Sequence, residues 1–356
     1  MKTPVISALD LVTVRQGKTP REAIARSAEL AQHVEKLGYH RFWLPEHHNV
    51  ALFASCAPAV LIGYIAGATQ SIRVGAGGVM LLNHAPLVVA EQFGTLESIY
   101  PGRIDLGLGR AAGASPVQEE TMKKVLRRDP QATGDNFPEW LAELQRYLGP
   151  ELENQEVKSG PGQGTNVPVY LLSSSGYSAR LAGELGLPFA FAAHIASQNL
   201  ESSLNLYRQH FRPSKTLKQP YVMVAIFALV AETDEEARKS FTSAQQFYLA
   251  AVRSKAIGTQ SQEKLLPPVE SMDALWSESE KQAVEKARSS AIVGSRKTVG
   301  AAIQSLIQET GADELIFWSD AYDYTERLRS YTILAEAVKS LPAEPISAQS
   351  EAAVLA

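Results

Sequence analysis

Short apolar segments and amphipathic helical segments alternate along this chain, and this alternation limits the possible fold more than any other feature of the sequence. Such alternation is the pattern of βαβ units, whose strands run parallel. Eight segments have strand character: Val5–Asp10, Arg41–Glu46, Ile72–Gly78, Ile104–Gly109, Val169–Ser173, Phe189–Ala193, Tyr221–Ala231 and Leu315–Trp318. Eight strands separated by helices predict an α/β fold of the closed (β/α)₈ TIM-barrel type rather than an open sheet.

The helical segments carry start and stop signals. The first begins with a capping box, Thr19 and Glu22, has Pro20 at its first position and stops at Gly38. One face of this helix is apolar, and its members are Ile24, Ala28, Ala31, Val34 and Leu37. Further helices are expected from Pro58, over Pro86–Ile99, Glu139–Tyr147 and Tyr177–Leu185, up to His210, and over Asp234–Val252 and Thr325–Lys339.

The length of 356 residues would suit two or three average domains, but α/β barrels use this much chain as one. We therefore predict a single domain over residues 1–341. An insertion between the seventh and eighth strands, about residues 253–295, contains a Pro-Pro pair and a helix expected near Ser277–Ala291. This insertion is either a functional lid or a packed decoration. Residues 342–356 are rich in Ala, Ser, Glu and Pro and are expected to be disordered.

Composition excludes several classes of function. The formal net charge is -4 and no long basic run occurs, so neither nucleic acid nor an anionic membrane surface is an expected partner. No apolar run is long enough to span a bilayer, and the amino-terminal segment lacks a signal-peptide pattern, so we expect a cytoplasmic protein. Cys56 is the only cysteine, which excludes an internal disulfide and a cysteine-based zinc site, and we expect it to be buried.

Unusual polar residues and glycines collect where four successive predicted strands end. They are Glu46, His47 and His48 after the second strand, Gly77 and Gly78 at the end of the third, Arg110 after the fourth, and Ser173, Ser174, Ser175 and Gly176 after the fifth. Barrels of this type place their sites at the carboxyl ends of the strands. The sequence therefore predicts one contiguous site along this arc.

The Ser173–Ser178 turn, with Arg110 one strand away, indicates an anion site. Hydroxyl groups and free backbone N–H groups at a helix amino terminus bind anions, although a serine-rich turn alone is usually an ordinary cap. The fork of Arg110 adds a permanent charge suited to phosphate, so the pair favours a phosphate site. Gly107 and Gly109 do not have the spacing of a dinucleotide fingerprint.

The histidines that follow strands allow a metal or a proton-transfer role. Successive residues leaving a strand point to opposite sides, so His47 and His48 are not expected to share an ion, and we predict no metal. Facing a phosphate site, His47 is a candidate for proton transfer. We expect structural roles for His84 and His194, which follow other strands.

These residues lie in segments that resemble the bacterial luciferase-like flavin monooxygenases, over nearly the whole chain to about Leu341. The run PGRIDLGLGR is the most specific of them. The segments that carry the resemblance are Gly38–His48 (GYHRFWLPEHH), Arg73–Met80 (RVGAGGVM), Pro86–Leu96 (PLVVAEQFGTL), Pro101–Arg110 (PGRIDLGLGR) and Ser173–Ala179 (SSSGYSA).

The resemblance implies reduced FMN as cosubstrate. It assigns the FMN phosphate to Arg110, Ser174, Ser175 and Ser178, and it counts Gly176 and Tyr177 of the same turn among the cofactor-binding residues. It puts Gly77 and Gly78 beside the isoalloxazine ring, with Glu46 approaching that ring, and it matches His47 to the family's catalytic histidine, which supports a flavin peroxide. Gly109 stands where the luciferases have a reactive cysteine, so light emission is not implied.

The same resemblance implies O₂ and a small organic molecule as substrates, together with a homodimer formed through the helices after the second and third strands. Because no dinucleotide fingerprint is present, reduced flavin is expected from a separate NAD(P)H:flavin reductase. Three alternatives stay open: hydride transfer with the deazaflavin F420, flavin binding without turnover, and a purely structural barrel. Oxygen consumption would separate FMN chemistry from F420 chemistry, because F420 reacts poorly with oxygen.

Overall fold

Eight parallel strands form a closed barrel in the computed structural model, which describes residues 4–111, 118–129, 133–259, 261 and 263–341. Closure comes from the pairing of β1 with β9 and of β7 with both β6 and β9. The barrel strands are β1 (Val5–Leu9), β2 (Arg41–Leu44), β3 (Arg73–Met80), β4 (Ile104–Gly109), β5 (Val169–Ser173), β6 (Phe189–Ala192), β7 (Val222–Ala231) and β9 (Glu314–Trp318). The predicted TIM barrel is therefore confirmed.

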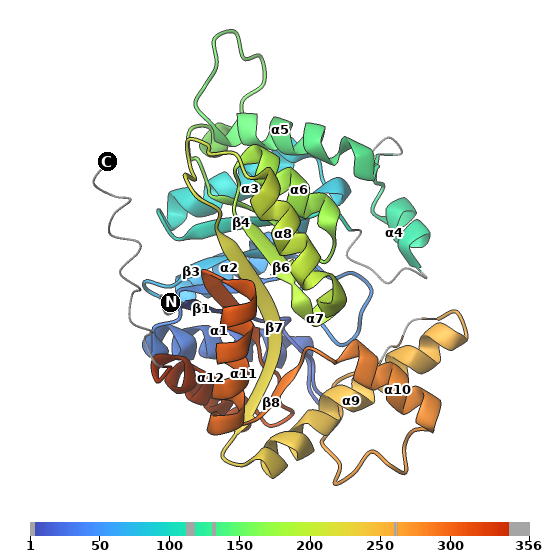
Figure 1. Ribbon diagram of the computed structural model, residues 1–356. Helices are drawn as coiled ribbons and strands as arrows, with labels where there is room; N and C mark the ends of the chain where they lie inside the picture. The colour runs from blue at the N-terminus through green and yellow to red at the C-terminus, as the bar shows by residue number, and fades with distance from the viewer. Residues whose placement is uncertain (1–3, 112–117, 130–132, 260, 262, 342–356) are drawn as a thin grey trace, which may run out of the picture.

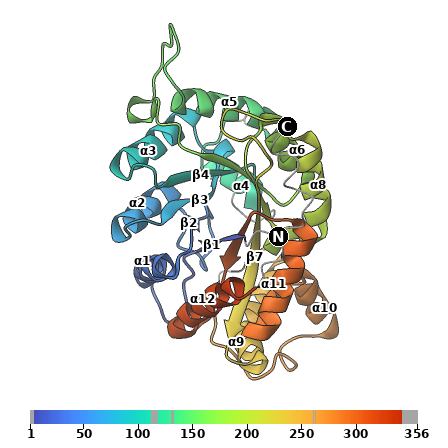
Figure 2. The ribbon, with the colours of Figure 1, turned by 60° about the vertical axis from the view of Figure 1, so that its left-hand side comes forward.

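Helices surround the barrel in chain order, as Figure 2 shows. The outer helices are α1 (Pro20–Leu37), α2 (Pro58–Ala68), α3 (Pro86–Ile99), α5 (Phe137–Leu148), α6 (Gly176–Leu185), α8 (Leu200–His210), α11 (Arg296–Thr310) and α12 (Tyr324–Lys339). Shorter or inserted helices are α4 (Glu119–Val125), α7 (Ala193–Ala196), α9 (Asp234–Ala256) and α10 (Glu278–Ala287). The predicted start of α1 is confirmed: Thr19 and Glu22 form a capping box, and Gly38 ends the helix at φ 84°.

A ninth strand, β8 (Ile292–Ser295), was missed by the sequence analysis, as was helix α11 that follows it. Strand β7 is twice as long as its neighbour β9, and only its first half pairs with β9. Its second half, Ala228–Ala231, continues beyond the barrel and pairs with β8 (Figure 1). The four residues of β8 are too few to show a period, so only this long-range pairing identifies them as a strand.

The predicted insertion contains α10 and β8, and it folds against the long helix α9. A small apolar cluster joins them, formed by Leu249, Met272 and Val284. The insertion also pairs with the segment after β1, because the backbone N–H of Gln16 donates to Leu265 and that of Leu265 donates to Val14. The tail at 342–356, expected to be disordered, lies outside the described residues.

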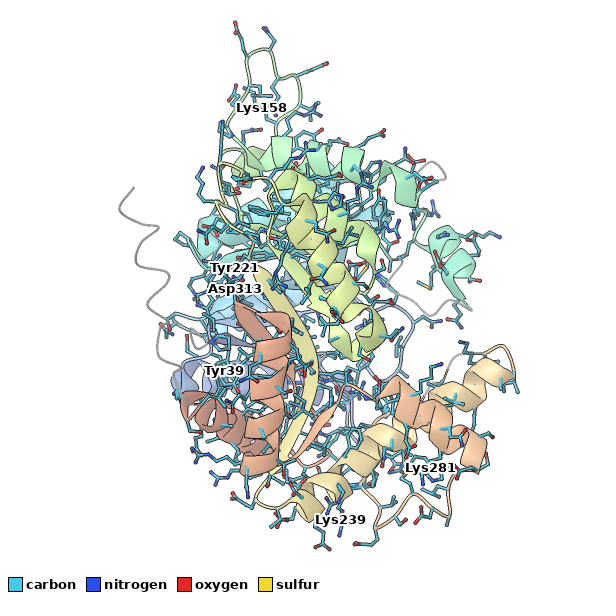
Figure 3. All side chains as sticks on the ribbon, in the orientation of Figure 1. Tyr39, Lys158, Tyr221, Lys239, Lys281 and Asp313 are labelled. Atoms are coloured by element: carbon cyan, nitrogen blue, oxygen red, sulfur yellow. The ribbon has the colours of Figure 1, made fainter. Side chains whose placement is uncertain are left out.

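Charged side chains fill the amino-terminal end of the barrel interior. Arg41 bridges Asp105 and Glu314 at 2.8 Å each, and the two carboxylates raise its pKa although burial opposes its charge. Tyr221 donates to Glu314 at 2.8 Å and lies beside Asp313 in Figure 3. Because this end is packed with paired charges, the space for a ligand lies at the carboxyl-terminal end.

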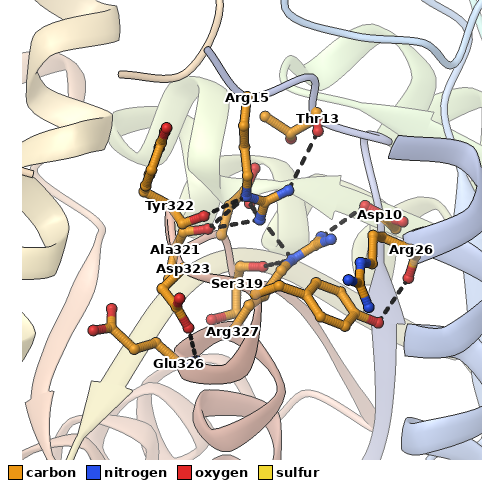
Figure 4. Close-up of polar contacts among 12 residues, drawn as sticks. Asp10, Thr13, Arg15, Arg26, Ser319, Ala321, Tyr322, Asp323, Glu326 and Arg327 are labelled. Carbon is orange, nitrogen blue, oxygen red and sulfur yellow. Dashed lines mark hydrogen bonds and ion pairs between the residues drawn. The ribbon is translucent and has the colours of Figure 1, made fainter. Parts of the chain in front are cut away.

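A second buried ion network ties the segment after β1 to the start of α12 (Figure 4). Arg327 binds Asp10 at 2.7 Å, and Arg15 binds Asp320 at 3.0 Å. Arg15 also donates to the backbone carbonyl of Tyr322 at 2.6 Å. The network therefore holds in place the stretch to which the insertion is attached.

Candidate functional site

A cavity of about 980 Å³ opens at the carboxyl ends of the strands, where the sequence predicted a site. Many of the predicted or considered residues line it together: His47, Gly77, Gly78, Gly109, Arg110, Ser173, Ser174, Ser175, Ser178 and His194. The remaining walls are mainly apolar and include Leu9, Leu11, Phe53, Phe247, Tyr248, Ile316 and Trp318. Gly176 and Tyr177 belong to the first turn of α6 beside this cavity.

The turn between β5 and α6 presents free backbone donors to the cavity. Ser175 is the N-cap of α6 but makes no side-chain cap bond. Instead its backbone N–H donates to the Ser173 hydroxyl at 3.0 Å, and Asn199 donates to the Ser174 carbonyl at 3.1 Å. The first N–H groups of α6 therefore remain available for an anion, with the buried Ser178 behind them.

Arg110 stands over this turn without an acidic partner among the described residues. Its guanidinium carbon lies 4.2 Å from the centre of the Tyr177 ring, so the ring orients the charge without neutralising it. Lys123 and Lys124 of α4 line the same end of the cavity, and Lys123 pairs with Glu120 at 2.7 Å. The sequence analysis missed these lysines because they lie in an exposed helix rather than at a strand end.

Gly77 and Gly78 give the cavity a wall of bare backbone. A Cβ atom on Gly78 would lie 2.7 Å from the carbonyl oxygen of Gly107. One on Gly77 would lie 3.1 Å from the side chains of Leu9 and Trp43. The pairing of β3 with β4 is irregular at this point, between Ala76 and Val79. Side chains are therefore excluded here, and a flat group can approach the backbone closely.

His47 follows β2, whereas the Ser173–Ser178 turn follows β5, three strands away in the sheet. Its ring packs on Phe53 with the centres 4.9 Å apart, and its buried Nδ1 has no hydrogen-bond partner. Burial lowers the pKa of His47 to about 4, although the charge of Glu46 opposes that shift. A neutral imidazole with a free nitrogen can accept a proton, which is what proton transfer requires.

His194 also lines the cavity, near the end of β6, and the sequence analysis gave it only a structural role. Its Nδ1 donates to the carbonyl of Ala225 at 3.2 Å, and its ring meets Trp318 edge-on. Burial lowers its pKa to about 4. The bond to Ala225 supports the expected structural role, while the cavity position adds a second neutral imidazole to the site.

Glu46 does not reach the cavity. Its side chain is fully buried behind the wall, where it accepts hydrogen bonds from His48 at 2.8 Å, His84 at 2.9 Å and the backbone N–H of Met80 at 3.0 Å. Burial alone would raise the pKa of Glu46, but the bonds from the histidines lower it to about 2. Glu46 is therefore not among the residues that line the cavity, whereas the next residue, His47, is. The approach of Glu46 to a flavin ring stays a prediction.

The described residues contain no group of three or more His, Cys, Asp or Glu side chains that could hold a metal ion. None of the helices in the described part of the chain is long and apolar enough to cross a bilayer. Cys56 is exposed, so the expectation that it is buried was wrong. It lies in the loop after β2, just before α2, where no strand or helix covers it.

Comparisons with known proteins agree with this geometry. The family model described as luciferase-like monooxygenase matches residues 6–314. The chain belongs to this family. It is 49% identical over 341 residues to the YvbT protein of Bacillus subtilis strain 168, covering 95% of this chain and 98% of that protein. It is 45% identical over 340 residues to a luciferase-like monooxygenase of Escherichia coli strain K12, covering 96% and 98%.

Among solved structures, apo-MsnO8 superposes with a TM-score of 0.81 and 33% identity, covering 96% of this chain and 100% of that one. Membership of the family makes this chain a flavin-dependent oxidoreductase of the oxygenase type. The predicted family is therefore confirmed, and the cavity at the strand ends is its candidate active site.

Proposed function

We propose that this protein is a monooxygenase that uses reduced FMN and O₂ to oxidise a small organic molecule. The observation that carries the proposal is the order in which charged, bare-backbone and neutral groups line the cavity described above. One end has the Ser173–Ser178 turn with its free backbone donors and Arg110, which has no acidic partner among the described residues. Next come the bare backbone of Gly77 and Gly78 and then the neutral His47. A flat cofactor with one phosphate tail matches that order of features.

Each group of residues has a distinct task in this proposal. Arg110 and the turn of Ser174, Ser175, Gly176, Tyr177 and Ser178 would hold the phosphate, and Gly77 and Gly78 would lie against the ring. Glu46 acts as a positioning residue, because its bond to the N–H of Met80 holds the end of β3. Reduced FMN, when bound, supplies the electrons with which one oxygen atom enters the substrate and the other leaves as water.

His47 would hold and release the proton that this chemistry requires. Because its pKa is about 4, the imidazole is neutral near pH 7 and can accept a proton from a group that enters the cavity. The apolar walls exclude water from the same space, which favours reaction with the organic substrate over loss to solvent.

Proteins with this fold use more than one flavin. The oxygenating constituent of 3,6-diketocamphane monooxygenase binds FMN, at a TM-score of 0.69 and 19% identity. An F420-dependent secondary alcohol dehydrogenase has a TM-score of 0.68 and 16% identity. These likenesses show the fold alone, so the choice of FMN rests on the likeness to proteins described as monooxygenases, because F420 reacts poorly with oxygen.

Anaerobic titration with reduced FMN and with reduced F420, followed by mixing with oxygenated buffer, tests the proposal. We expect tight binding of reduced FMN and oxygen consumption that continues only while a separate NAD(P)H:flavin reductase is present. Preferential binding of F420 without oxygen consumption would replace the proposal with hydride transfer. Rapid oxidation of NADH or NADPH by the protein and FMN alone would remove the need for a reductase.

We further propose a homodimer through α2 and α3, the helices that follow β2 and β3. Both helices expose large apolar side chains: Val60 is 73% exposed, Tyr64 50%, Val88 43% and Ile99 59%. Burial of such residues drives association. Light scattering at micromolar concentration should give the mass of a dimer, and the double variant Val60→Asp/Tyr64→Asp should give a monomer. A monomeric parent would refute the proposal.

A further inference from the structure

Arg288 is a buried arginine that the functions assigned so far do not use. It follows α10 in the insertion, and it is only 5% exposed. Its guanidinium carbon lies 4.6 Å from the ring centre of Phe227, 4.6 Å from that of Tyr248 and 5.4 Å from that of Trp318. Within the described part of the chain, no carboxylate lies within ion-pair distance of it. Three aromatic rings therefore surround a buried positive charge that has no counter-ion among the described residues.

The hydrogen bonds of this guanidinium are incomplete in a specific way. Nη1 donates to the hydroxyl of Tyr248 at 2.7 Å, whereas Nε and Nη2 are buried and have no partner. Nε and Nη2 form one edge of the planar group, and their N–H bonds point the same way. This is the edge that receives a carboxylate through two parallel hydrogen bonds. Tyr248 thus anchors the group and leaves its bidentate edge open.

A second buried donor without a partner belongs to one of the three rings around Arg288. The indole Nε1 of Trp318 is buried and makes no hydrogen bond, and the Trp318 ring is one of the three that surround Arg288. Three donor nitrogens of these two side chains, Nε and Nη2 of Arg288 and Nε1 of Trp318, therefore lack acceptors among the described residues. Buried donors are normally satisfied, and donors alone, with a positive charge, are satisfied by an anion.

This cluster adjoins the active-site cavity beside the ends of β6 and β9. Trp318, Tyr248 and His194 all line the cavity, and Arg288 lies immediately behind the first two. The segment is held there because the hydroxyl of Ser290 donates to the carbonyl of Ala193, the first residue of α7, at 2.8 Å. The nearby cavity walls formed by Leu11, Phe53 and Ile316 are apolar.

We propose that the Nε–Nη2 edge of Arg288 and the indole N–H of Trp318 bind the carboxylate, or a similar oxyanion, of the substrate. The substrates are then organic acids with an apolar body, which lies along the apolar walls near His47 while the acid group is held at the insertion. That the bound acid is the molecule oxidised rests on the proposed function. The binding site itself does not depend on it.

Nuclear magnetic resonance of the protein without flavin tests the site directly. The chain has four tryptophans, so the indole N–H signal of Trp318 can be assigned with a Trp318→Phe variant. Titration with acetate and with 4-phenylbutyrate should shift this signal saturably, and the neutral acetamide should not. Arg288→Met should weaken the acetate response by about tenfold or more, as for a lost charge-assisted pair. Arg288→Lys should give an intermediate response, because it keeps the charge and loses the fork.

Arg253→Met is the matched control, because Arg253 lies in the preceding helix and pairs with Glu280 at the surface. The Trp318 signal of Arg253→Met should respond to acetate as it does in the parent protein. No saturable shift of the Trp318 signal with either carboxylate up to about 0.1 M would overturn the site. An equal shift in a folded Arg288→Met protein, or in Arg288→Lys if the methionine variant does not fold, would also overturn it.

A flavin titration separates this inference from the proposed function. Arg288→Met should bind reduced FMN as tightly as the parent, and a loss of flavin affinity would show that Arg288 serves the flavin phosphate instead. If acetate binds as expected and the parent does not bind reduced FMN, the acid site stands and the proposed function fails. The opposite result removes the acid site and leaves the proposed function intact.

Discussion

The two ends of the cavity differ in the charge and the exposure of the side chains that line them. At the end formed by β4 and β5, Arg110 and the lysines of α4 are partly exposed, and backbone donors are free. At the end formed by β2, β6 and β9, His47 and His194 have their pKa values lowered to about 4 by burial, and Arg288 is surrounded by rings. The first end offers permanent charge in contact with water, and the second offers neutral proton acceptors in an apolar setting.

This difference shows how one cavity can separate binding from chemistry. A phosphate is held well by charges that never titrate, and its affinity tolerates water. Proton transfer needs a group whose charge can change, in a place from which water is excluded. Substitutions at the two ends should therefore affect different measurements, and the following predictions test that separation.

The largest effect is expected for His47→Ala. Loss of an acid–base group should lower turnover by roughly two to four powers of ten, while flavin affinity stays near that of the parent. Hydrogen peroxide release should rise, because reduced flavin then reacts without transferring oxygen to substrate. Product, peroxide and flavin-titration assays measure these quantities.

His84→Ala is the control for this variant, because it removes a partner of the buried Glu46 and should lower thermal stability more than chemistry. A His47→Ala protein that folds, binds FMN and oxygenates at the parental rate would exclude His47 from the mechanism.

Arg110→Ala should show the opposite pattern. Losing a charge-assisted contact of roughly 1.5–3 kcal/mol should weaken FMN binding about tenfold to 150-fold. Turnover should recover when flavin is saturating, because the distant end of the cavity is unchanged. Arg180→Ala, in the same helix as Tyr177 but paired with Glu184 at the surface, is the matched control for the flavin titration. Unchanged affinity in Arg110→Ala would place the phosphate elsewhere.

Gly78→Ala tests the wall between the two ends. The added Cβ would lie 2.7 Å from the Gly107 carbonyl, so β3 or β4 must shift, at a cost of about 1–3 kcal/mol in the free energy of unfolding. Gly300→Ala in α11 is the control, because nothing lies within 4 Å of its added Cβ and alanine favours a helix. Thermal melting compares the two variants, and equal melting temperatures would contradict the packing described for β3.

The smallest effect is expected in the pH dependence of stability. His47 and His194 have folded pKa values of about 4, below the ordinary value of 6.5, so the unfolded chain takes up protons first as the pH falls. Above pH 6.5 this proton uptake costs no stability. As the pH falls from 6.5 towards 4, the free energy of unfolding decreases by no more than about 1.4 kcal/mol per pH unit for each histidine. Urea melts at pH 7 and pH 5 should show a smaller loss for His47→Ala than for the parent. Equal losses would mean that His47 is not buried as described.

Much of the site could be predicted because its signals are local. Apolar segments, capping residues and the glycine at the end of a helix identified the elements, and parallel strands necessarily bring their carboxyl ends to one edge. This is why the sequence predicts that His47, Gly78, Arg110 and Ser175 lie in one site. The resemblance then supplied the flavin, which residue types alone do not specify.

The sequence by itself therefore determined the barrel, the edge that carries the candidate site and many of the residues that line the cavity there. Only the tertiary structure decided that Glu46 turns inward to His48 and His84, that β8 pairs with the end of β7, and that Arg288 lies behind Tyr248 and Trp318 of the cavity wall. These outcomes depend on contacts between segments far apart in the chain. Sequence periodicity and helix caps do not predict such contacts, because the contacts depend on how the other elements of the barrel pack around them.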